Sequence, residues 1–153
     1  MHIRPRIALV SLAAVLLVAG CGSSAKTGTH TTTTSIGSGD KITFRDKNNV
    51  VRVAVAGGAT ATPASARRDL ARVRGTHVEA APRFFHVPEG RAVKVVYSTE
   101  SAPNSVTGKR VTLVVDRYYL RHGGREAVVD LGTPRGVDNV DAYRLMIESF
   151  RWR

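Results

Sequence analysis

The chain has 153 residues and a formal net charge of +11, because 23 Lys and Arg residues outnumber 12 Asp and Glu residues. Such a positive field favours anionic partners: lipid headgroups, cell-wall polymers or acidic proteins. The basic residues are scattered and not interleaved with aromatic ones, which argues against nucleic acid. The single cysteine excludes a framework of disulfides within the chain.

The first twenty residues have the pattern of a secretory signal. Arg4 and Arg6 make a positive start, and residues 7–19 are almost all apolar. A helix of about thirteen residues is roughly 20 Å long, too short for a bilayer core of about 30 Å. The run ends in VAGC, which resembles the lipobox of bacterial lipoproteins. That resemblance implies cleavage between Gly20 and Cys21 and lipid attachment to Cys21, on the extracytoplasmic side of the cell membrane. The alternative is an uncleaved anchor helix with an incidental cysteine.

A segment rich in Ser, Thr and Gly follows the cysteine. Residues 22–39 contain no apolar residue larger than Ala except Ile36. Such a composition predicts a disordered tether, and eighteen flexible residues have a root-mean-square span of roughly 23 Å. Its threonines are either glycosylated or part of a plain polar spacer. The expected organisation is a signal peptide (1–20), a lipidated cysteine with its tether (21–39) and one folded α+β domain (40–153).

The folded part begins with two alternating runs, 41–45 and 50–56, joined by a turn rich in Asp and Asn. This pattern predicts a hairpin. A helix is expected next, capped by Thr62, with Pro63 in its first turn and Gly75 at its end. Its outer face carries four basic residues that form either a binding surface for an anionic partner or an ordinary solvated face: Arg67, Arg68, Arg72 and Arg74.

Four further strands are expected at residues 83–87, 91–98, 110–122 and 125–131. The pair Gly123-Gly124 predicts a two-residue hairpin turn between the last two. After Asp116 the alternation breaks down, which indicates a bulge or a second packed face. Asp116 and Asp130 are expected to pair with arginines across this hairpin, as surface pairs of little energetic value.

The last element is a helix over residues 138–151, with Asp138 as its cap and Asp141 near its positive end. The order of elements predicts an α+β fold: an antiparallel sheet flanked by helices. The helix has an apolar stripe that should face the sheet: Val140, Tyr143, Met146, Ile147 and Phe150.

Residues 40–153 resemble PsbP-like domains, the Mog1/PsbP superfamily. The resemblance implies an α-β-α sandwich with a non-catalytic role, either in assembly or in binding a partner protein. Family members usually start with an extra strand that carries a Tyr-Pro pair, and Thr and Gly residues occupy that place here. This departure leaves open whether the first family strand is present. The resemblance rests on FRD (44–46), NVVRVAV (49–55), DRY (116–118), REAVV (125–129) and a closing IESFRW (147–152).

No motif of catalysis accompanies this pattern. His77, His86 and His122 are isolated and lack the spacing of zinc ligands. No Gly-x-Ser-x-Gly elbow or phosphate-binding loop is present. We therefore expect no catalytic residues, no metal and no cofactor, and a lipid-anchored accessory or binding domain that engages an anionic surface or an acidic protein. The alternatives are a hydrolase or transferase with an unrecognised site, and a structural envelope protein that binds anionic polymers. The sequence indicates neither the partner's identity nor the oligomeric state.

Overall fold

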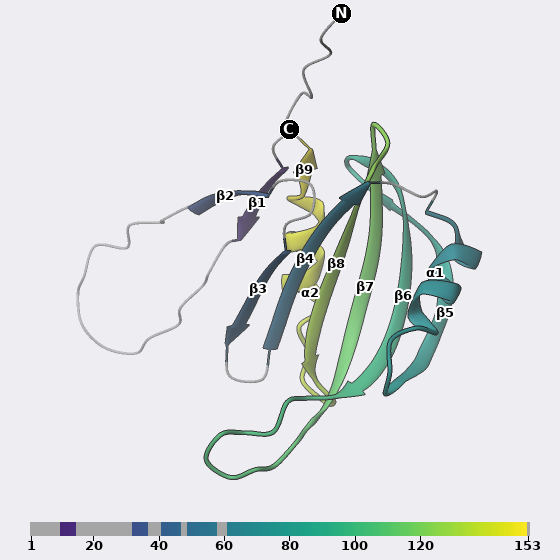
Figure 1. Cartoon of the computed structure of the whole chain (residues 1–153). Helices are drawn as coiled ribbons and strands as arrows, with labels where there is room; N and C mark the ends of the chain where they lie inside the picture. Colours follow the sequence, from purple (N-terminus) through teal and green to yellow (C-terminus); the bar gives the residue numbers. More distant parts are fainter. Residues whose placement is uncertain (1–9, 15–31, 37–40, 47–48, 58–60, 153) are drawn as a thin grey trace, which may run out of the picture.

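The computed structural model describes residues 10–14, 32–36, 41–46, 49–57 and 61–152. Its main body is a six-stranded sheet in the order β3-β4-β8-β7-β6-β5, and every neighbouring pair is antiparallel (Figure 1). The strands are β3 (Lys41–Asp46), β4 (Asn49–Gly57), β5 (Thr76–Val87), β6 (Gly90–Glu100), β7 (Thr112–His122) and β8 (Arg125–Pro134).

The two helices pack on opposite faces of this sheet. Helix α1 (Pro63–Leu70) buries Ala66 and Leu70 against Val93, Val95 and other residues of one face. Helix α2 (Val140–Glu148) packs on the other face, against the alternate side chains of the strands, such as Val53 and Val129. The predicted α+β arrangement of an antiparallel sheet flanked by helices is therefore confirmed.

Local signals account for the first helix. The backbone N–H of Ser65 donates to Thr62 Oγ1 at 3.0 Å, and Ser65 Oγ accepts the Thr62 N–H at 2.9 Å. This reciprocal pair satisfies two donors that a helix start leaves unpaired. The helix ends at Leu70, not at the expected Gly75, which lies in the following turn with φ +69°.

The structure corrects the extent of β5, which runs from Thr76 and not from Arg83. Its first half shows no alternation of apolar residues because β5 is an edge strand whose side chains are mostly exposed. Its pairing with β6 shifts register on both sides of Ala80. Apolar periodicity does not identify such a strand, because its side chains do not have to alternate between a continuous core and solvent.

The hairpin between β7 and β8 turns at Gly123-Gly124, as expected. Both glycines have positive φ, +54° and +78°, which only glycine adopts without strain. β7 pairs with β6 and with β8 in regular register, so the broken alternation is not a bulge. Arg117 through Leu120 are all buried because both faces of this central strand are covered.

The apolar stripe of α2 is confirmed in part. Tyr143, Ile147 and Phe150 are buried, and Phe150 is only 1% exposed. The prediction for Val140 is wrong, because its side chain is 70% exposed although Tyr143 in the same turn is buried. The helix starts after Asn139, and Asp138 accepts the Val140 N–H at 3.1 Å.

A second, small sheet has the order β2-β1-β9, formed by Val10–Ala14 (β1), Thr32–Ile36 (β2) and Arg151–Trp152 (β9). β1 belongs to the expected signal peptide and β2 to the expected tether, so cleavage before Cys21 would remove β1. Gly20 and Cys21 lie outside the described residues, and the lipid attachment site stays a prediction. None of the described helices is both long and apolar enough to cross a membrane.

Candidate functional site

A buried ion pair lies at the centre of the sheet face that α1 covers. Arg117 Nε donates to Asp130 Oδ1 at 2.6 Å, and Arg117 Nη2 donates to Asp130 Oδ2 at 2.9 Å. The two residues are register partners on β7 and β8, so the sheet itself aligns them. Their side chains are 8% and 4% exposed. This pair was expected at the surface; instead it is a two-pronged bond in the interior.

The ion pair extends into a network that joins α1 to the sheet. Arg117 Nη1 lies 3.4 Å from Asp69 Oδ2, and Tyr119 Oη donates to the same oxygen at 2.8 Å. On the other side Arg52 Nη1 lies 3.5 Å from Asp130 Oδ2. Asp69, the one acid of α1, therefore points toward the sheet and is held there by two partners.

Burial and charge set the protonation states in this network. Burial opposes the charge of Arg117, but its hydrogen bonds to Asp130 and the charge of that carboxylate outweigh it and raise the pKa of Arg117. Burial also raises the pKa of Tyr119, with a contribution from Asp69. Both groups therefore stay protonated at neutral pH, and Tyr119 remains a donor to Asp69.

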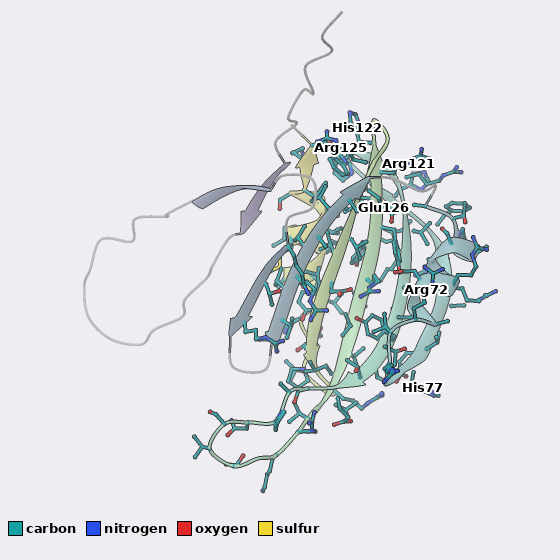
Figure 2. The ribbon with its side chains drawn as sticks, in the orientation of Figure 1. Arg72, His77, Arg121, His122, Arg125 and Glu126 are labelled. Atoms are coloured by element: carbon teal, nitrogen blue, oxygen red, sulfur yellow. The ribbon has the colours of Figure 1, made fainter. Side chains whose placement is uncertain are left out.

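Above this network lies an open hollow of about 270 Å³ between α1 and the sheet. Glu126 of β8 is half-buried beside it, and its pKa is raised by burial and by the charge of Asp69. Figure 2 labels Arg72 next to α1 and Glu126 near the hairpin end of the sheet. The hollow thus combines two cations, two carboxyl groups and two hydroxyl groups: Arg68, Arg72, Asp69, Glu126, Ser65 and Tyr119.

The four arginines of the predicted basic surface are all exposed. Only Arg67 and Arg68 lie on the helix, because α1 ends at Leu70 and Arg72 and Arg74 lie in the turn that follows. Arg68 and Arg72 line the hollow, and Arg67 and Arg74 do not. We call these residues the α1 basic face: Arg67, Arg68, Arg72 and Arg74. Sequence reasoning missed Glu126 and Tyr119, which lie at least 49 positions after the end of α1 and reach it only through the sheet.

A second group of cations at the β7–β8 turn was also missed. The rings of His122 and Trp152 stack with centroids 6.0 Å apart and an interplanar angle of 23°. The Arg125 guanidinium lies 5.2 Å from the Trp152 ring centre. Figure 2 shows His122, Arg121 and Arg125 together at this end of the sheet. The sequence signal is present in Arg121-His122-Gly-Gly-Arg125, but the sequence does not show that Trp152 packs against this turn.

Comparison of the chain with protein-family models, curated proteins and solved structures finds no match. Within the described part of the chain, no three His, Cys, Asp or Glu side chains come together as metal ligands. The argument for function therefore rests on the geometry and charge of the chain's own residues.

Proposed function

We propose that the protein is a membrane-anchored, extracytoplasmic accessory domain that binds an anionic surface or an acidic protein partner without catalysis. Lipidation of Cys21 anchors it, and the α1 basic face makes the contact. The anchor is supported by the lipobox-like sequence, and the contact by the arrangement of charge on α1.

The observation that carries this proposal is the separation of charges on α1. Asp69 is turned toward the sheet, where Arg117 and Tyr119 occupy one of its carboxylate oxygens. Arg67 and Arg68 point to solvent from the last turn of the helix, where cations are favourable. The outer surface of this region therefore presents cations whose nearest acid, although 46% exposed, is bonded to the sheet through one carboxylate oxygen.

We also propose that the folded domain is PsbP-like, an α-β-α sandwich. This is supported by the order of its elements and by a helix on each face of an antiparallel sheet. The chain closes on Ser149-Phe150, and Phe150 is packed in the core as the resemblance implies. Such a fold does not determine a particular partner.

The test is co-sedimentation of the protein with anionic vesicles and with cell-wall polymer at low and high salt. Exposed charges are screened within about 8 Å at physiological salt, so binding through the α1 basic face should weaken steeply as salt rises. Reversing Arg68 and Arg72 to Glu should slow association more than it disturbs folding.

A matched control reverses Lys109 and Arg110, which lie in the exposed loop between β6 and β7 (Figure 1). The control changes the net charge by the same amount at a place remote from α1. Equal binding by all three proteins, or binding that high salt leaves unchanged, would show that the α1 basic face is only a solvated surface.

A second candidate, a hydrolase or transferase, is favoured by one observation. The hollow brings Asp69 and Glu126 to one site, and the raised pKa of Glu126 suits a proton donor. A hydrolytic activity that is lost in Glu126→Gln and retained in the Lys109 and Arg110 variant would favour the enzyme over the binding domain.

A further inference from the structure

We infer that the end of the sheet at the β7–β8 turn faces the membrane and docks on anionic lipid headgroups. This inference rests on the proposed lipid anchor and assigns the lipid to a surface other than the α1 basic face. We call that surface the hairpin end; it comprises Lys41, Arg91, Arg121, His122, Arg125, Arg151 and Trp152.

The pairing registers place the start of the folded domain at this end. Lys41 pairs with Ala54 of β4, and three residues further along β4, Gly57 pairs with Arg125. Arg125 in turn pairs with His122 across the hairpin. The chain therefore enters the sheet at Lys41, close to the β7–β8 turn.

The expected tether joins the sheet directly at this point. In the structure residues 32–36 form β2, which pairs with β1, and cleavage before Cys21 would remove that partner. As a flexible chain, residues 22–39 then span roughly 23 Å. The hairpin end is consequently the part of the sheet that a lipid on Cys21 keeps nearest to the bilayer. The β6–β7 loop lies at the end of the sheet opposite the β7–β8 turn (Figure 1).

Charge at the hairpin end suits anionic headgroups. Arg91, Arg121 and Arg151 are exposed there. Of the neighbouring acids, Glu89 pairs with Arg151 at 3.7 Å and offsets that one cation, and Glu126 is half-buried with a raised pKa. Basic residues close to an anionic membrane each contribute about 1 kcal/mol, or roughly fivefold in association.

The aromatic residues at this end fit the same interface. Trp152 is the only tryptophan of the chain, and it lies half-buried between the His122 ring and the Phe150 ring. Arg91 covers the ring of the exposed Phe84 at 4.3 Å. The indole nitrogen of Trp152 is buried, so the ring edge beside His122 and Arg125 is what lies near the headgroups when this end docks.

The hairpin end and the α1 basic face can act at the same time. Helix α1 lies along the face of the sheet and contacts β5 and β6, whereas the hairpin end caps the strands (Figure 1). With the hairpin end on the bilayer, the α1 basic face remains open at the side for another anionic partner.

The experiment uses the single tryptophan as its reporter. The lipid-anchored protein purified from membranes is reconstituted into vesicles of phosphatidylcholine, alone or mixed with an equal part of phosphatidylglycerol. A trace lipid carries a spin label on its headgroup, and quenching of Trp152 fluorescence is recorded at low and high salt. We expect stronger quenching in the anionic vesicles and its loss at high salt.

The variant Arg91→Glu with Arg121→Glu should lower the docked fraction, since losing two basic residues weakens association about 25-fold even before the added acids repel the lipid. Neither residue is an observed ring partner of Trp152, so the fluorophore keeps its His122, Arg125 and Phe150 neighbours. Lys109→Glu with Arg110→Glu is the control of equal charge.

Each outcome bears on a different part of the argument. If the protein still sediments with the vesicles at high salt, two results would overturn the docking inference. One is equal quenching in neutral and anionic vesicles, and the other is equal quenching in the two variants. Protein that leaves the vesicles at high salt would refute the lipid anchor, and the docking inference with it. Loss of quenching in the Arg68 and Arg72 variant alone would assign the lipid to the α1 basic face.

Discussion

Replacing Arg117 with Met tests whether the buried network holds α1 and the sheet together. Met has a similar length but no charge, so the change leaves Asp130 with an exposed fraction of 4% and with Arg52, whose Nη1 lies 3.5 Å from Asp130 Oδ2, as its one remaining cationic partner in the described network. Breaking a buried ion pair on one side costs about 3–5 kcal/mol, because the remaining charge is left uncompensated. For a domain of this size that corresponds to a loss of roughly 12–20 °C in melting temperature.

The assay is urea unfolding followed by far-UV circular dichroism, for the wild type and for a double-mutant cycle. Arg117→Met combined with Asp130→Leu removes both charges and should recover at least about 2 kcal/mol of the loss, since a buried pair exchanged for apolar residues is often near neutral. Arg52 then loses its partner, but its side chain is 34% exposed and water can solvate it.

The control for this prediction is an exposed ion pair, Arg144 with Asp141 at 2.9 Å. Their side chains are 59% and 84% exposed, so Arg144→Met should cost under about 0.5 kcal/mol. If Arg117→Met costs no more than Arg144→Met, or if the double variant is as unstable as the single one, the network does not stabilise the fold in the way we describe.

Three further predictions test the core, the anchor and the hollow. Phe150→Ala should destabilise the domain by about 3–5 kcal/mol because a buried aromatic ring leaves a cavity, while Leu145→Ala, 61% exposed, should change little in the same urea titration. Cys21→Ser should give an unlipidated protein with an uncut signal, and a free thiol at residue 21 in the mass spectrum of the mature wild type would contradict the anchor. The pKa of Glu126 is raised in the folded state, so the folded protein binds a proton more tightly than the unfolded chain. The free energy of unfolding should therefore fall as pH rises from 4.5, the usual pKa of Glu, through the raised pKa of Glu126. Glu126→Gln should abolish that step in a pH series of unfolding curves, and a step of equal size in the variant would show that another group causes it.

Local chemistry explains why much of the fold could be predicted. The β3–β4 hairpin, the Thr62 cap and the Gly123-Gly124 turn each depend on a few neighbouring residues, and all three are present. The burial of Phe150 is confirmed, but α2 ends at Glu148 and not at residue 151, so Phe150 packs in the core from just beyond the helix. The extent of β5 could not be predicted in the same way, because an edge strand does not need an alternating core face.

The buried residues of the candidate site come together only through the pairing of strands that lie far apart in the sequence. Arg117 and Asp130 were recognised as partners across the hairpin, but the hairpin does not reveal whether its faces are covered. Helix α1 covers this one, although it precedes Arg117 by more than forty positions. Glu126 reaches the hollow for the same reason: the sheet, and not its sequence neighbours, brings it toward Asp69.

Because Asp130 is buried, the charges that stabilise the fold are separate from the exposed charges that we propose bind a partner. Asp130 is paired in the interior, where salt screens little, whereas the α1 basic face and the hairpin end lie in solvent within reach of ions. Rising salt should therefore release an anionic partner at concentrations that leave the urea midpoint almost unchanged. Exposed acids such as Asp141, which pairs with Arg144, neutralise the surface locally, and their interactions should respond to salt together with binding. Asp130 differs from them because it is buried against Arg117, so its contribution to stability should persist at salt concentrations that release the partner.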